Sequence, residues 1–213
     1  IMAELKVVGI GAGYFSGFQY RAWNRIPETE VAALCNRSRE KAQPLMEQCR
    51  IPNHYTDWRR MLDEERPDVV DIITPPSTHY EMCREAADRG IHIVCQKPLA
   101  PTLEEAKKIV AYMASKPVRF MDHENWRFQT PIRQVKRALD DGKIGHPFRS
   151  RIHYCSSVPV FDKQPLLKEL EQFILTDMGS HILDGARFLF GEAESGYCHT
   201  SRIKRAIKGE DEA

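Results

Sequence analysis

The hydrophobic and polar positions of the chain change period repeatedly between residues 5 and 126. Short apolar runs, of the kind that form strands buried on both faces of a parallel sheet, lie at residues 5–11, 30–36, 68–75, 91–96 and 118–126. Helical spacing of apolar residues fills the intervals, at residues 17–25, 38–50, 56–65, 77–90 and 101–115. Strands that alternate with helices in this way predict an α/β domain with a doubly wound parallel sheet.

Single residues mark where several of these helices begin, bend or end. Pro44 lies inside one helical stretch and predicts an interruption or a kink, because proline lacks the backbone donor that the helix needs. Gly90 is expected to cap the end of the helix at residues 77–90. Thr102 and Glu105 are three residues apart, the spacing of a capping box.

The pattern weakens after residue 122. Thr130 and Pro131 are typical of a helix start, and this helix is expected to run to about Gly142. Further along, strands are predicted at residues 147–157 and 195–203, with a helix at residues 166–191 between them. Two short strands and a few helices cannot close a sheet. We therefore expect one domain over residues 1–122, and over residues 123–213 the beginning of a second α+β domain that is truncated here.

The composition excludes several classes of protein. Lys and Arg number 31 and Asp and Glu 30, with no basic block, so nucleic-acid binding has no electrostatic support. No apolar run approaches the roughly 18 residues of a membrane span, and the start of the chain lacks a secretory pattern. The six cysteines are irregularly spaced, without a C-x-x-C pair, so neither a disulfide framework nor a zinc site is expected. These features favour a cytoplasmic protein that binds a small molecule.

Ligands of doubly wound sheets bind beyond the carboxyl ends of the strands. Here that edge would carry residues 11–16, 36–37, 74–79 and 96–98. The first of these stretches, GAGYFS, has the strand–turn–helix context of a dinucleotide fingerprint. Gly11 permits the tight turn, Gly13 lets the backbone approach a pyrophosphate, and Tyr14 and Phe15 lead to the small residue Ser16 at the third position. The alternative is a glycine turn that only joins strand to helix.

The end of the second strand bears on the choice between NAD and NADP. An Asp or Glu is expected there to bind the adenosine ribose, but the chain has Asn36 followed by Arg37. A neutral side chain beside an arginine does not repel a 2′-phosphate, which favours NADP slightly. In the alternative, Asn36 binds the ribose of NAD and Arg37 is a solvated charge.

Three longer segments, GIGAGYFS, TPPSTHYEMCREAADRGIHIVCQKPLA and LTDMGSHILDGARFLFGE, resemble the glucose-fructose oxidoreductase/inositol dehydrogenase (Gfo/Idh/MocA) family. The resemblance covers essentially the whole chain. It implies a Rossmann domain followed by a domain with a large, open, mostly antiparallel sheet, which is the family's usual dimer surface. A homo-oligomer, dimer or tetramer, is therefore expected.

The resemblance also implies roles for particular residues. A T-P-x-x-x-H segment would line the nicotinamide ribose; its matching positions are Thr74, Pro75, Pro76 and His79. The family's Glu-Lys-Pro motif, whose lysine is catalytic, matches Gln96, Lys97 and Pro98, with glutamine in place of glutamate. The family's D-x-x-x-H pair matches Asp177 and His181.

The chemistry of these side chains suits the oxidation of an alcohol. Loss of a hydride from the carbon requires loss of the hydroxyl proton, which an amine or an imidazole within reach can accept. Lys97 is therefore a candidate proton carrier, although a lysine at the end of a strand is more often a solvated charge. Asp177, His181 and Asp184 share one helix face at i, i+4 and i+7.

On this face, Asp177 could orient His181 or bind substrate hydroxyls, and His181 could exchange the proton. The alternative is an intrahelical pair on a wet face. A metal site is not expected, because no third and fourth ligand cluster nearby. Asn125 and Arg127 could bind substrate hydroxyls, although Arg127 is equally suited to a structural ion pair.

These residues favour an NAD(P)-dependent oxidoreductase that acts on a sugar, a cyclic polyol or a sugar derivative. Two alternatives remain. One is a regulatory protein that binds the dinucleotide without turnover. The other is a redox-assisted lyase or glycosidase, in which oxidation is transient and the cofactor is regenerated.

Overall fold

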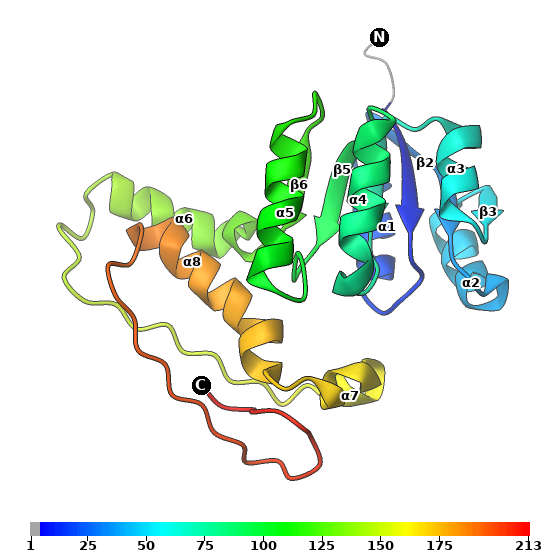
Figure 1. The fold of residues 1–213 in the computed structure, drawn as a ribbon. Coiled ribbons are helices and arrows are strands. Elements are labelled where there is room, and N and C mark those ends of the chain that lie inside the picture. The colour runs from blue at the N-terminus through cyan, green and yellow to red at the C-terminus, as the bar shows by residue number, and fades with distance from the viewer. Residues whose placement is uncertain (1–4) are drawn as a thin grey trace. The chain divides into compact units, whose positions relative to one another are not determined.

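The computed structural model describes residues 5–213, apart from the side chain of Leu166. The chain forms two compact units, with the boundary between His123 and Glu124. The first unit contains the sheet, and the second contains helices joined by long irregular segments (Figure 1).

The first unit is built on a parallel sheet with the strand order β3-β2-β1-β4-β5-β6. Its strands are β1 (Leu5–Ile10), β2 (Thr29–Cys35), β3 (Asn53–Tyr55), β4 (Val69–Ile72), β5 (His92–Gln96) and β6 (Phe120–His123). Every neighbouring pair is parallel, so the predicted doubly wound α/β architecture is confirmed. The sequence pattern missed β3, because its three residues are too few and too polar to show a period of two.

Helices cover both faces of this sheet (Figure 1). They are α1 (Ser16–Trp23), α2 (Arg39–Cys49), α3 (Trp58–Glu65), α4 (His79–Asp88) and α5 (Leu103–Ala114). Side chains of α3, α4 and α5 share one buried core with β1, β2, β4 and β5, and side chains of α1 and α2 share a second core with β2. Burial on both faces explains why the strands read as continuous apolar runs.

The predicted helix signals have different outcomes. The helix α2 continues through Pro44, so the expected interruption is absent. Gly90 has a φ of +75° and follows α4, as the predicted cap requires. The side chain of Thr102 accepts a hydrogen bond from the backbone N–H of Glu105 at 3.2 Å, which confirms half of the capping box.

The second unit is mainly helical among its described residues. Its elements are η2 (Trp126–Phe128), α6 (Thr130–Asp140), α7 (Val160–Lys163), η3 (Pro165–Glu169), η4 (Leu175–Gly179) and α8 (Ser180–Phe190). The helix expected from Thr130 is confirmed as α6. The helix expected at residues 166–191 is broken after η3, and its second half contains the π-helical turn η4 directly before α8.

Both strands predicted in the second unit are wrong. Residues 147–159 contain neither helix nor strand, and residues 195–203 form only an isolated antiparallel bridge between Ser201 and Glu212. An alternating pattern becomes a strand only when a neighbour satisfies its backbone groups. No such neighbour exists for these segments within residues 5–213.

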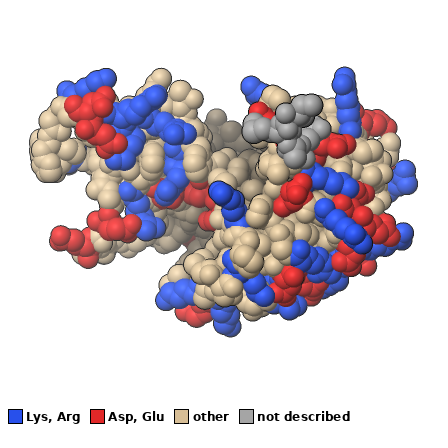
Figure 2. Space-filling model, turned by 90° about the horizontal axis from the view of Figure 1, so that it is seen from above, with Lys and Arg blue, Asp and Glu red and all other residues tan. Residues whose placement is uncertain are grey.

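Charged side chains of both signs are interspersed over the face shown in Figure 2. This distribution agrees with the near balance of 31 basic and 30 acidic residues. Within residues 5–213, no helix has the length and apolar character needed to cross a membrane.

Candidate functional site

The parallel register brings the ends of the strands to one edge of the sheet. Ile10 pairs with Cys35 on one side and with Ile72 on the other, and Ile72 pairs with Cys95. The residues that follow β1, β2, β4 and β5 therefore lie along one edge, the place where doubly wound sheets bind ligands. The sequence predicted cofactor-binding residues at each of these strand ends.

The glycine turn after β1 has the shape of a phosphate cradle. Gly11 has a φ of +119°, and a Cβ at this position would overlap the backbone oxygen of Ile73, so only glycine fits. A Cβ on Gly13 would meet no described atom within 4 Å. Gly13 is thus not required by packing within the protein, and the open space beside it is suited to the close approach of a ligand.

The start of α1 offers backbone donors to that space. Phe15 precedes the helix without a side-chain hydrogen bond to its first turn. The hydroxyl of Ser16 donates to the carbonyl oxygen of Gly13 at 2.5 Å and so closes the turn. Backbone N–H groups at a helix start, together with the helix dipole, favour a phosphate group.

Buried hydrogen bonds hold α1 against the sheet. The phenol of Tyr20 donates to the carbonyl oxygen of Gly11 at 2.8 Å. The amide of Gln19 and the indole N–H of Trp23 both donate to the carboxylate of Asp71 on β4, at 3.0 Å and 2.7 Å. Burial raises the pKa of Asp71 to about 6, while the bonds from Trp23 and Gln19 oppose that rise. By holding α1 against the sheet, these hydrogen bonds fix the orientation of the candidate phosphate cradle.

The end of β2 carries the residues expected to bind the adenosine ribose. The amide of Asn36 donates to the backbone oxygen of Ser38 at 2.7 Å, and the carbonyl oxygen of Asn36 lies 3.1 Å from Nε2 of His54. Arg37 is exposed beside it. Asn36 thus holds the loop with its NH2 group, which orients the amide side chain at the predicted ribose position.

The loop after β4 differs from the expectation for His79. Thr74 and Thr78 share a hydroxyl hydrogen bond of 2.7 Å, and Pro75 and Pro76 lie between them at the surface of the loop. His79, however, is fully buried. Its ring nitrogens lie 2.9 Å and 3.0 Å from the carbonyl oxygens of Thr74 and Leu99.

His79 therefore lies buried between two loops, with one ring nitrogen close to a backbone carbonyl oxygen of each. One loop carries Thr74, and the other follows Lys97 through Pro98 and Leu99. Burial lowers the pKa of His79 and the backbone hydrogen bonds oppose that shift, so the neutral ring is favoured. A neutral imidazole has only one N–H, so only one of the two carbonyl oxygens accepts a hydrogen bond from the ring.

The end of β5 holds the predicted catalytic lysine. Lys97 is partly buried, and the peptide bond that joins it to Pro98 is cis. The amide nitrogen of Gln96 lies 2.9 Å from Nδ1 of His123 at the end of β6. The ring of His123 lies 6.2 Å from that of Phe15, which connects this corner to the glycine turn. The amide nitrogen of Gln96 thus faces a ring nitrogen that can accept its hydrogen.

The second unit places a carboxylate beside His181 that the sequence did not single out. Glu124, the first residue after β6, forms a short hydrogen bond with Nδ1 of His181 through its Oε1 atom. Both side chains are largely buried. Asp177 lies in the π turn η4, one turn before His181. Sequence reasoning missed Glu124, which had no motif to mark it.

An aromatic stack covers the imidazole of His181. The indole of Trp126 lies parallel to it, with ring centroids 4.8 Å apart and an interplanar angle of 4°. Tyr154 contacts the same indole at 5.4 Å. Together with Glu124, these contacts limit rotation of the imidazole ring.

Asp184 and Arg127 form an ion pair in the second unit. The guanidinium of Arg127 contacts both carboxylate oxygens of Asp184, with its Nε at 2.8 Å. This hydrogen bonding raises the pKa of Arg127. Of the two roles open to Arg127, the structure supports the structural ion pair.

Two buried polar atoms of the second unit have no hydrogen-bond partner among the described residues. They are the amide oxygen of Asn125 and the hydroxyl of Ser180. Buried acceptors are rarely left unsatisfied in proteins. The amide oxygen of Asn125 could therefore accept a hydrogen bond from a ligand, and the predicted role of this residue in substrate binding stays a prediction.

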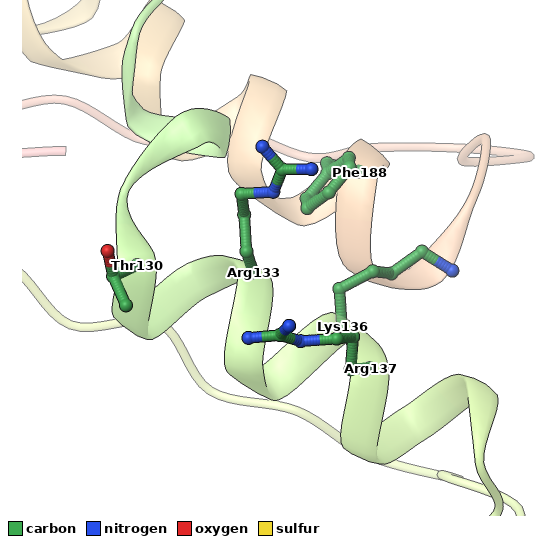
Figure 3. Close-up of a pocket in the computed structure, with 5 residues that line it drawn as sticks. All are labelled: Thr130, Arg133, Lys136, Arg137 and Phe188. Carbon is green, nitrogen blue, oxygen red and sulfur yellow. The ribbon is translucent and has the colours of Figure 1, made fainter.

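A pocket of about 240 Å³ lies elsewhere in the second unit, between α6 and α8 (Figure 3). It is lined by Thr130, Arg133, Lys136, Arg137 and Phe188. None of these is a predicted site residue, and Lys136 forms an ion pair with Asp140 on the surface of α6. We do not place the candidate site in this pocket. No group of three or more potential metal ligands is present within residues 5–213.

Comparison with known proteins identifies two family regions in the chain. A family described as an oxidoreductase family with an NAD-binding Rossmann fold matches residues 5–123. The C-terminal domain of the GFO/IDH/MocA family matches residues 132–213. The resemblance seen in the sequence motifs is thereby confirmed.

Two similar proteins are named D-apiose dehydrogenase. The protein of Paraburkholderia graminis is 43% identical over 204 residues, which are 96% of this chain and 54% of that protein. The protein of Rhizobium rhizogenes is 38% identical over 212 residues, all of this chain and 61% of that protein. The chain thus spans somewhat more than half the length of these relatives.

Solved structures show the same similarity. An oxidoreductase from Agrobacterium radiobacter, in complex with NAD+, L-tartaric acid and magnesium, is 38% identical with a TM-score of 0.94, over 98% of this chain and 61% of that one. A levoglucosan dehydrogenase in complex with NADH and levoglucosan is 29% identical with a TM-score of 0.74, over 88% and 54% of the two chains.

Proposed function

Because this chain belongs to the Gfo/Idh/MocA oxidoreductase family, we propose that it is part of an NAD(P)-dependent dehydrogenase that oxidises a hydroxyl-bearing carbon of a sugar, a cyclic polyol or a sugar derivative. The observation that carries the proposal is the 43% identity to a D-apiose dehydrogenase over 96% of the chain. That name favours a small furanose or pentose sugar as the first substrate to test.

The first unit fits a dinucleotide. Its open cradle at Gly13, the start of α1 and the single edge formed by the strand ends are the features that support binding. The Asn36–Arg37 pair favours NADP, whereas the structure that is 38% identical holds NAD+. Both cofactors therefore belong in the test.

A bound nicotinamide dinucleotide would supply the hydride acceptor. The chain's own side chains would handle the proton that leaves the sugar hydroxyl: Lys97 and His181 are proposed to exchange it, and Asp177 to bind or orient the substrate. The carbon loses a hydride and its oxygen a proton, so an alcohol becomes a carbonyl, or a lactol becomes a lactone.

The proposal also covers the domain organisation, the oligomeric state and the cellular location. We propose residues 1–122 as the dinucleotide-binding domain, and residues 123–213 as the start of a substrate domain with an open, mostly antiparallel sheet. In that sheet, residues 147–157 and 195–203 would find the strand partners they lack here. A homo-oligomer and a cytoplasmic location complete the proposal; six unpaired thiols, four of them buried, suit a reducing compartment.

The test is the absorbance of reduced nicotinamide over time. Protein from the complete reading frame that contains this sequence is mixed with NAD+ or NADP+ and with D-apiose, levoglucosan, xylose and inositols. A rise in absorbance is expected with one cofactor and a subset of the sugars. Protein that binds cofactor but never reduces it would contradict the proposal and favour a sensor or a redox-assisted lyase.

Substitutions test the proposed roles of Lys97 and His181 in proton transfer. Lys97→Met and His181→Ala are each expected to abolish turnover while the dinucleotide still binds. Lys107→Met, an exposed lysine on α5, and His146→Ala, an exposed histidine, are matched controls that should retain full activity. If the first pair lost cofactor binding instead, the proposed division of roles would be wrong.

A further inference from the structure

Glu124 reaches His181 from outside the helix that carries the histidine. It follows β6 directly, and its Oε1 contacts Nδ1 of His181, 57 residues further along the chain. Glu124 is 9% exposed and His181 7% exposed. A carboxylate this deeply buried is stable only when it is hydrogen-bonded. The contact with His181 meets that requirement.

This contact determines which imidazole nitrogen can react. An ionised carboxylate only accepts hydrogen bonds, so the nitrogen that faces it must carry the hydrogen. With the hydrogen on Nδ1, the lone pair of the neutral ring is on Nε2. An imidazolium formed at Nε2 would also be stabilised by the adjacent carboxylate, as in hydrolase triads.

The same short segment fixes the plane of the ring. Trp126 is two residues after Glu124 and stacks on His181 at 4.8 Å. Arg127 is the next residue and binds Asp184, which is three residues after His181 on α8. Contacts from Glu124, Trp126 and Arg127 thus fasten this segment along α8 and hold the imidazole in position.

We propose that Glu124 is the positioning residue of His181: it holds the Nδ1–H tautomer, so that Nε2 is the atom that exchanges the proton of the sugar hydroxyl. This inference rests on the proposed dehydrogenase function. In the oxidative direction the hydroxyl proton moves to Nε2, the hydride leaves for the cofactor, and the hydrogen on Nδ1 stays in its bond to Glu124. Glu124 touches neither substrate nor cofactor in this scheme.

The tautomer can be measured without any turnover. Protein labelled with ¹⁵N-histidine gives distinct ring-nitrogen signals for the Nδ1–H and Nε2–H tautomers, and His181→Ala identifies the signal of interest among those of the other histidines. The Nδ1–H tautomer is expected for His181, and Glu124→Gln should shift it toward a mixture or toward Nε2–H. An Nε2–H tautomer of His181 in the unsubstituted protein would overturn the proposal, even if every Glu124 variant failed to fold.

Enzyme kinetics provide a second test of the role of Glu124. Glu124→Gln keeps the shape of the side chain and removes its charge, so kcat is expected to fall by about 100-fold, with the KM of sugar and cofactor within about threefold. The kcat of Glu124→Ala should fall further. Added formate should restore part of it, because formate can occupy the space left by the side chain and accept a hydrogen bond from Nδ1. If Glu124 were only structural, its variants would not lower kcat while leaving KM nearly unchanged, and formate would not restore activity.

The control is Glu192→Gln, the same chemical change at an exposed ion pair with Arg187 in the same unit. It should leave kcat and the histidine signals unchanged. If Glu124→Gln kept its kcat within about threefold of the parent, the positioning role would be refuted. If the unsubstituted protein proved inactive on all substrates, the dehydrogenase proposal would fail while the tautomer measurement still decided the role of Glu124.

Discussion

The two units of this chain differ in where their backbone groups find partners. In the first unit, each of the six strands pairs within one sheet, and the apolar side chains of both faces are buried. In the second unit, α6 has no buried residue, and residues 147–159 contain no helix or strand. A parallel sheet with its crossover helices completes its own hydrogen bonds and cores, whereas single helices and isolated extended segments do not.

The second unit is nevertheless well organised at one place. Glu124 and Trp126 enclose His181, and Arg127 binds Asp184 one turn along α8. Order in the first unit thus comes from a continuous core, and order in the second is concentrated in polar and aromatic contacts around one histidine. The predictions that follow test this contrast.

The largest expected effect is at the glycine turn of the first unit. Gly11→Ala should lower the free energy of unfolding by about 4 kcal/mol, because a Cβ would combine an unfavourable φ with overlap at the oxygen of Ile73. Chemical denaturation measures it. Gly13→Ala should leave stability unchanged, because its Cβ meets open space, but should weaken dinucleotide binding. Equal effects of the two variants on stability would contradict this reading of the turn.

The next effect concerns the buried carboxylate that anchors α1. The pKa of Asp71 is raised from 3.8 to about 6, so the native state binds this proton more tightly than the unfolded state. The stability from that proton is present below about pH 4 and is lost as the pH rises through about 6, an amount of about 3 kcal/mol.

Asp71→Asn removes this titration while both partners, Gln19 and Trp23, can still hydrogen-bond. The free energy of unfolding of the variant should therefore rise relative to the parent between about pH 4 and about pH 6. Urea denaturation at several pH values measures the difference. A difference that does not change with pH would show that Asp71 does not titrate in this range.

A smaller effect is expected for the ion pair of the second unit. Arg127→Lys should cost about 1 kcal/mol of stability, because lysine cannot contact both oxygens of Asp184 and the pair is partly exposed. Arg187→Lys, at a more exposed pair with Glu192, is the control and should have no measurable effect. A large rise in the KM for sugar with unchanged stability would instead assign Arg127 to substrate binding.

The smallest effect is expected at the pocket between α6 and α8. Arg133→Ala should change stability by less than about 0.5 kcal/mol and leave turnover intact, because this exposed side chain belongs to no buried contact or candidate site. Thermal denaturation and the dehydrogenase assay check it together. A loss of activity here would mean that the pocket takes part in function.

Much of the first unit was predictable from local pattern. The alternation of strands and helices, the glycine turn at Gly11 and the cap at Thr102 all follow from periodicities and turn chemistry that act over a few residues. The three residues of β3 escaped because so short a strand has no detectable period. The strands predicted at residues 147–157 and 195–203 were wrong because alternation does not supply a pairing partner.

The candidate site was predictable only where a motif marks it. The spacing around Lys97 and His181 pointed to proton transfer, but the partners of these motifs come from distant parts of the chain. His79 carries the motif expected of a cofactor contact, yet it is buried and braces two loops. Glu124 and Trp126 carry no motif and lie against His181.

By itself, the sequence determined the parallel sheet, the position of the dinucleotide fingerprint and the family, because these depend on the order and period of nearby residues. Only the tertiary structure decided that the carboxylate of Glu124 contacts His181 and that Asp71 is buried beneath α1. Both depend on contacts between residues about 50 positions apart, which only the folding of the backbone brings within hydrogen-bonding distance.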